Sequence, residues 1–165
     1  MTNKQNAANQ QNLNREKILV MGVGNILMAD EGIGVEIVNK MQALDLPDHV
    51  ELLDGGTAGL DLMPYMKDKK KIIIIDCINS KEPPGTVYKM TPLDLEKNNT
   101  IPINSMHQIT LAETIQLSRL LGNKAEIVVI GITPKNYKHY SLEISPELEA
   151  VKDKVIKIVL QEIEI

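Results

Sequence analysis

The stretch Lys17-Ile-Leu-Val-Met-Gly-Val-Gly-Asn-Ile-Leu-Met-Ala-Asp-Glu-Gly-Ile-Gly34 decides the fold of this chain. An apolar run, expected as a strand over 18–23, leads into a glycine-rich bend, and the helix expected next begins with two carboxylates, Asp30 and Glu31. Such a bend normally indicates a phosphate site, because glycines let the backbone approach an anion and the helix N-terminus offers free N–H groups. Here the protein itself supplies the negative charge. The stretch therefore favours a cation, or a metal brought in by a partner, over a phosphate.

Composition and charge argue against several classes of protein. The 165 residues, 43% of them hydrophobic, suit one ordinary domain, and a net charge of −4 without a basic stripe argues against nucleic acid as a partner. Cys77 is the single cysteine, which excludes an internal disulfide and a cysteine-based zinc site and is typical of a reducing cytoplasm. Residues 1–16 are rich in Asn and Gln and are expected to form a flexible leader before a single α/β domain over 17–165. No apolar run is long enough to span a bilayer, so no membrane insertion is expected.

Apolar runs and helical patterns alternate along the whole chain, which predicts an α/β fold with a doubly wound, mostly parallel sheet of about five strands and helices on both faces. The run Ile72–Ile75 is apolar on both faces, as expected for a central strand covered on both sides. Strands are expected at 18–23, 50–53, 71–78 and 125–132, with an additional edge strand, parallel or antiparallel, at 86–90. Helices are expected at 31–44, up to about 66, at 108–121 and from Ser145-Pro146-Glu147 onward with Ser145 as the cap, and 91–106 is expected as a loop.

Ligands of such a sheet bind beyond the carboxyl ends of the strands, near the point where the winding reverses. Glu31 follows the first expected strand, Asp76 ends the third, and His107 precedes the third long helix, so these three form the best-placed set. Each has a structural alternative: Glu31 can complement the helix dipole, Asp76 can make a structural hydrogen bond, and His107 can be a helix-start residue without a task. Capping is the default role for Asp30. A carboxylate at the end of an isoleucine run is costly unless it is paired or bound, which favours a functional role for Asp76. Further rim residues expected to contact a substrate are Asn25, Asp30, Asp54, Gly55, Gly56 and Thr57.

Two carboxylates and one imidazole make a possible but loose metal site, because late first-row metals prefer nitrogen and sulfur donors. Loose coordination suits a protein that touches a metal held mainly by a partner, and no tightly bound cofactor of its own is expected. Cys77 neighbours Asp76 in a strand, so its side chain points to the opposite face, where a small buried hydrophobe is expected.

Four motifs in order make the chain resemble the nickel-iron hydrogenase maturation endopeptidases. They are Gly22–Gly34, Asp54–Gly59, Ile75–Cys77 with the Pro-Gly turn after it, and Met106–Gln108, and the resemblance covers nearly everything from 17 to the last helix. It implies a cytoplasmic endopeptidase that removes the C-terminal extension of a hydrogenase large-subunit precursor after nickel insertion. Members of that family recognise nickel in the precursor through an acidic residue, an Asp and a His. These match Glu31, Asp76 and His107, which are therefore expected as metal contacts and catalytic residues.

The resemblance leaves the chemistry open between a carboxylate-activated water, with the metal polarising the scissile carbonyl, and a metal that only positions the substrate. It implies that the nickel is carried by the substrate and that the partner is the large-subunit precursor, and a monomer is expected when the protein is free. Two other functions stay open. A nickel-delivery chaperone that does not cut would use the same three residues, and a nucleotide-binding module would explain the glycines but not the carboxylates.

Overall fold

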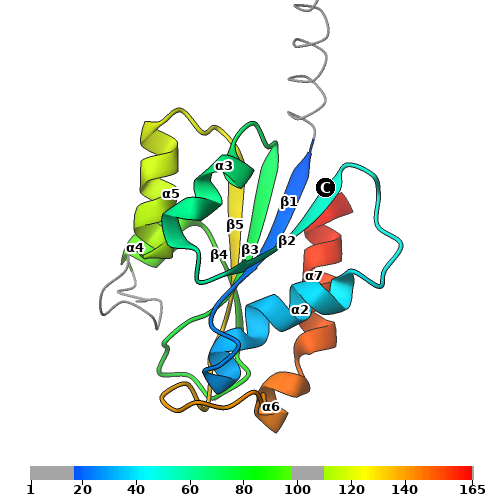
Figure 1. Ribbon diagram of the computed structural model, residues 1–165, viewed down its shortest axis with the longest axis vertical. Helices are drawn as coiled ribbons and strands as arrows, with labels where there is room; N and C mark the ends of the chain where they lie inside the picture. The colour runs from blue at the N-terminus through cyan, green and yellow to red at the C-terminus, as the bar shows by residue number, and fades with distance from the viewer. Residues whose placement is uncertain (1–16, 98–109, 165) are drawn as a thin grey trace, which may run out of the picture.

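The computed structural model describes residues 17–97 and 110–164, which form a five-stranded sheet in the order β2-β1-β3-β5-β4 (Figure 1). Strands β1, β2, β3 and β5 pair in parallel, and β4 pairs antiparallel with β5 at one edge. This confirms the doubly wound, mostly parallel sheet and decides the direction of its edge strand. The strands are β1 (Ile18–Val23), β2 (Val50–Gly56), β3 (Lys71–Cys77), β4 (Val87–Met90) and β5 (Glu126–Ile132).

Helices cover both faces of the sheet and complete a three-layer sandwich (Figure 1). Helices α2 and α7 pack on one face, while α3, α4 and α5 lie on the other. The helical segments are η1 (Ala29–Gly32), α2 (Ile33–Met41), η2 (Gly59–Leu62), α3 (Met63–Met66), α4 (Pro92–Lys97), α5 (Leu111–Leu120), α6 (Pro146–Glu149) and α7 (Lys152–Glu164). No helix in the described ranges is long and apolar enough to cross a membrane.

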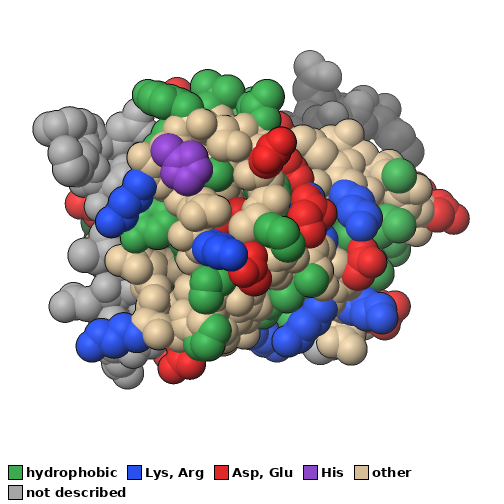
Figure 2. Space-filling model, turned by 90° about the horizontal axis from the view of Figure 1, so that it is seen from below, with side chains coloured by type: hydrophobic (Ala, Val, Ile, Leu, Met, Phe, Trp, Pro, Cys, Tyr) green, Lys and Arg blue, Asp and Glu red, His purple; other side chains and the backbone are tan. Residues whose placement is uncertain are grey.

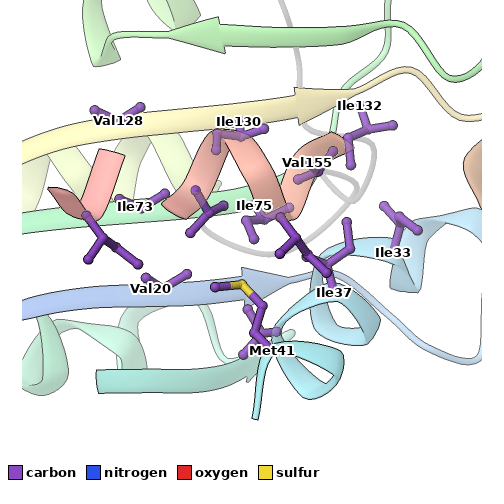
Figure 3. Packing of buried hydrophobic residues seen from close by; sticks show 14 of the residues in the cluster. Val20, Ile33, Ile37, Met41, Ile73, Ile75, Val128, Ile130, Ile132 and Val155 are labelled. Carbon is purple, nitrogen blue, oxygen red and sulfur yellow. The ribbon is translucent and has the colours of Figure 1, made fainter. Parts of the chain in front are cut away.

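The core is aliphatic and divides into two clusters, one on each face of the sheet. Figure 3 shows how Val20 of β1 and Ile73 of β3 face the helical side chains Ile37 and Val155 in the cluster beneath α2 and α7. Every residue of β3 is buried, because helices cover this central strand on both sides. Burial on both faces explains why the isoleucine run shows no alternation with polar residues.

The glycines of the first motif let the segment from η1 to α2 pack directly on the strands. A Cβ atom on Gly34 would lie 2.2 Å from the carbonyl oxygen of Ile75, and one on Gly24 would lie 1.8 Å from the carbonyl oxygen of Glu31. Gly24 also has a φ of 133°, a conformation that other residues rarely adopt. The glycines therefore bring Glu31 close to the ends of β1 and β3, a packing role that needs no phosphate.

Three expected element boundaries are wrong. The helix expected at 31–44 starts as the 3-10 turn η1 and ends at Met41, which leaves Leu44 exposed, and β2 continues beyond 53 to Gly56. Part of the loop expected at 91–106 is helix α4, because the backbone N–H and the hydroxyl of Thr91 both donate to Asp94, at 2.8 and 2.7 Å. Residues 98–109 lie outside the described residues, and with them the expected start of the helix at 108.

Candidate functional site

The candidate site lies where the winding of the sheet reverses, between β1 and its parallel neighbour β3. The two strands are in register from Ile18 opposite Lys71 to Gly22 opposite Ile75, so η1 leaves β1 beside the carboxyl end of β3. Figure 2 looks onto this end of the molecule. The segment η1 contacts β3, and the charge of Glu31 acts on Asp76, so the structure brings these two acids close together.

Glu31 has an unusual environment for a carboxylate. It lies in η1, only 4% of its surface is exposed, and its Oε1 atom has no hydrogen-bond partner. Burial raises the pKa of Glu31 above its ordinary value. An unpartnered buried oxygen costs free energy, so the carboxylate is arranged to receive a proton, a donor or a cation.

Asp76 is the second buried carboxylate and the more strongly perturbed one. Burial is the main cause that raises the pKa of Asp76 to about 8, the charge of Glu31 adds to it, and a hydrogen bond from the Cys77 backbone N–H opposes it. Among the described residues no lysine or arginine contributes to the shift of either pKa. Two adjacent buried acids with raised pKa values form a site that a metal ion would stabilise in its ionised form.

The third expected metal contact, His107, lies outside the described residues. Within 17–97 and 110–164 no group of three or more His, Cys, Asp or Glu side chains could hold a metal ion. His49 and His139 are exposed at the surface. The described part of the chain thus offers two carboxylates, and a complete site needs a further ligand.

Asp30 has a role that the sequence did not reveal. Its carboxylate is fully buried and does not cap the helix, since it accepts hydrogen bonds from distant backbone N–H groups of Lys135 at 2.8 Å, Asn136 at 2.7 Å and Ser145 at 2.7 Å. Ser145 occupies the N-cap position of α6 as expected, but its hydroxyl makes no cap bond and donates instead to the Asp30 carboxylate at 2.9 Å. Asp30 therefore ties the loop 133–145 to η1. The prediction that Asp30 contacts substrate stays a prediction.

Among the remaining rim residues, the side chains of Asn25 and Asp54 make hydrogen bonds within local turns. Asn25 accepts from the N–H of Leu27 at 3.0 Å, and Asp54 accepts from the N–H of Gly56 at 3.1 Å, so both side chains shape the loops in which they lie. Gly55 is buried, whereas Asp54 and Thr57 are exposed and accessible to a ligand. Their expected contact with a substrate stays a prediction.

Two further side chains complete the surroundings of the site. The Cys77 thiol is buried and donates to the carbonyl oxygen of Asp30 at 2.9 Å, and burial raises the pKa of Cys77, so the thiol is a packing group and a weak donor. Thr133, at the end of β5, is buried and its Oγ1 atom has no partner. In the sequence, the only feature that indicates a place for Thr133 at the site is its position directly after the inner strand β5.

Comparison with known proteins gives a consistent result. Residues 35–162 match the family model described as hydrogenase maturation protease. The hydrogenase 2 maturation protease of Escherichia coli strain K12 is 38% identical over 147 residues, 87% of this chain and 88% of that protein. A putative hydrogenase maturation protease of Methanocaldococcus jannaschii is 34% identical over 156 residues, 92% of this chain and 99% of that protein. The structure of the hydrogenase maturating endopeptidase HybD from E. coli aligns with a TM-score of 0.80 at 36% identity and covers 90% of this chain and 92% of that one.

Proposed function

This chain belongs to the hydrogenase maturation protease family, and from that premise we propose that it removes the C-terminal extension of a nickel-iron hydrogenase large-subunit precursor. In this proposal the nickel is part of the substrate, and the protein recognises it through Glu31, Asp76 and His107. The reaction takes place in the cytoplasm, a reducing compartment that suits the free thiol of Cys77, and the free enzyme is a monomer.

The pair of buried carboxylates carries the proposal. Within the part of the chain that the structure describes, Glu31 has an unpartnered oxygen, burial raises the pKa of Asp76 to about 8, and no lysine or arginine stabilises either carboxylate. Such a pair costs stability in the free protein, and a divalent cation would offset that cost. A metal ligand must be deprotonated, so an arriving nickel ion displaces the proton that Asp76 holds at neutral pH.

The weak donor set explains why the metal comes with the substrate. Two carboxylate oxygens and a single imidazole bind nickel loosely, whereas cysteine thiolates of a precursor bind it tightly. His107, which precedes the α5 cap Thr110 by three residues in the sequence, supplies the third contact in this proposal. The nickel thereby places the precursor's C-terminal segment over the exposed rim at Asp54 and Thr57.

The test is cleavage of a precursor that is either loaded with nickel or empty. We expect the chelated and washed enzyme to shorten the loaded precursor and to leave the empty one uncut, as read by mass spectrometry. Asp76→Asn, Glu31→Gln and His107→Ala should each lower the rate by about 100-fold, because a three-contact site loses its geometry with one contact gone.

Exposed residues provide matched controls. Asp153→Asn and His139→Ala change the same chemical groups at the surface and should leave the rate unchanged. Cleavage of the empty precursor at a comparable rate, or an enzyme that works only after its own metal is restored, would refute substrate-borne nickel and favour an ordinary metallopeptidase. Binding of the loaded precursor without any cleavage would favour a delivery chaperone.

A further inference from the structure

We infer that Asp30 is a positioning residue for this reaction: its buried carboxylate locks the loop 133–145 against η1 and thereby holds Glu31 in the site. The inference rests on the proposed function, because the position of Glu31 matters only if Glu31 contacts the substrate's metal. Asp30 itself is 0% exposed and its carboxylate is held by the loop, so in this proposal it acts through its neighbours.

The Asp30 carboxylate contacts the loop 133–145 near both ends of the loop. The carboxylate accepts backbone N–H groups from Lys135 and Asn136 near the start, and the N–H and hydroxyl of Ser145 at the end, with all four distances between 2.7 and 2.9 Å. The backbone adds a bond from the Asp30 N–H to the carbonyl oxygen of Asn136 at 3.0 Å. A carboxylate that accepts several backbone N–H groups is held far more firmly than a neutral group.

A neighbouring strained residue shows that the loop determines the backbone of η1. Ala29, directly before Asp30, has a φ of 52°, which is unfavourable for a residue with a Cβ atom. Its N–H donates to the carbonyl oxygen of Ser141 in the same loop at 2.8 Å. Because such a conformation persists only when surrounding contacts over-determine it, releasing the loop would let the start of η1 relax.

The contacts of Asp30 affect the position of Glu31 through the peptide bond between these two residues. The carbonyl oxygen of this peptide accepts the Cys77 thiol at 2.9 Å, and its N–H donates to the carbonyl oxygen of Met28 at 3.2 Å. Cys77 follows Asp76 directly, so one short path of contacts sets the spacing between the two acids. The Oε1 atom of Glu31 has no hydrogen-bond partner among the described residues, so no bond at that atom fixes the side chain.

The experiment compares Asp30→Asn with a matched change at Glu162. Glu162 is another buried carboxylate, in α7, that pairs with Lys71 and Lys89. Lys71 begins β3 at the end of the strand opposite the site. An asparagine at position 30 keeps the shape of the side chain. In either orientation of its amide, however, the NH2 group faces N–H donors of the loop and cannot accept from them, so hydrogen bonds to the loop are lost. Glu162→Gln weakens a buried ion pair without touching the loop.

We expect Asp30→Asn to lower kcat for nickel-loaded precursor by about tenfold with KM within about twofold, as for the loss of a group that orients a metal contact. Glu162→Gln should keep kcat at a temperature where both variants are folded. Hydrogen exchange should show that the amides of Asn136 and Ser145 lose protection in the first variant alone. Equal kcat in the two variants, or a change in KM alone, would overturn the inference.

A milder pair keeps the test decisive if Asp30→Asn does not fold. Ser145→Ala removes one of the four donors, and Ser118→Ala removes the hydroxyl of another buried serine, which donates to the carbonyl oxygen of Ile115 at 2.7 Å in α5. Only the first should reduce kcat, and equal rates would again overturn the inference. A wild-type chain that cuts no precursor would refute the proposed function and this inference together, whereas normal cutting by all variants would refute the inference alone.

Discussion

Replacing Asp76 by asparagine should make the folded chain more stable at neutral pH while lowering the cleavage rate by about 100-fold. In the folded chain the pKa of Asp76 is about 8 against an ordinary value of 3.8, mainly because the group is buried. A raised pKa means that the folded state holds a proton which the unfolded state releases once the pH exceeds 3.8. The contribution of Asp76 to stability is therefore most favourable below 3.8 and falls as the pH rises toward 8.

The magnitude follows from the size of the shift. One pKa unit corresponds to ~1.4 kcal/mol, so Asp76 lowers the free energy of unfolding by about 1 kcal/mol at about pH 4.5 and by about 5 kcal/mol at about pH 7.5. Asparagine does not titrate, and its side-chain oxygen can still accept the N–H of Cys77. The stability gain of Asp76→Asn over wild type should therefore grow by about 4 kcal/mol between these two pH values.

The assay is urea unfolding of both proteins at the two pH values, followed by far-UV circular dichroism because the chain has no tryptophan. Asp153→Asn is the control, since Asp153 is exposed and its ion pair with Lys40 is solvent-screened, so its difference from wild type should change little with pH. A gain for Asp76→Asn that is the same at both pH values would refute the reasoning. That result would mean that Asp76 is ionised in the folded chain.

Two further changes test the other buried polar groups. Cys77→Ala loses a weak S–H donor and a small volume, so we expect a loss of about 1 kcal/mol in urea unfolding with cleavage retained; an inactive but folded variant would instead indicate thiol chemistry. Glu162→Ala removes the nearer acidic partner of the buried Lys71 and leaves the more distant and exposed Glu126 beside it. The variant should lose about 3 kcal/mol in the same assay without a lower kcat. A loss below about 1 kcal/mol would show that the ion pair with Lys71 is not a net stabilising contact.

The sequence predicted most of the fold because its signals are local and repeated. The isoleucine run of β3 and the alternation of strands with helices are sufficient for a doubly wound sheet, and its winding rule places Glu31 and Asp76 at one rim. The sequence predicted the ends of helices and strands less well, because each end depends on a few capping contacts. The bonds from Thr91 to Asp94 make a helix of a stretch that was expected as a loop.

The sequence by itself determined the α/β class, the switch point and the identity of the two acids that meet there, because each follows from periodicity and strand order. Only the tertiary structure decided how those acids are held. Asp30 is adjacent to Glu31 in the chain and is read locally as a cap, yet its hydrogen-bond donors lie more than a hundred residues away, at Lys135, Asn136 and Ser145. Burial likewise raises the pKa of Asp76 to about 8. Desolvation and long-range hydrogen bonds exist only after distant segments pack, so no local pattern encodes them.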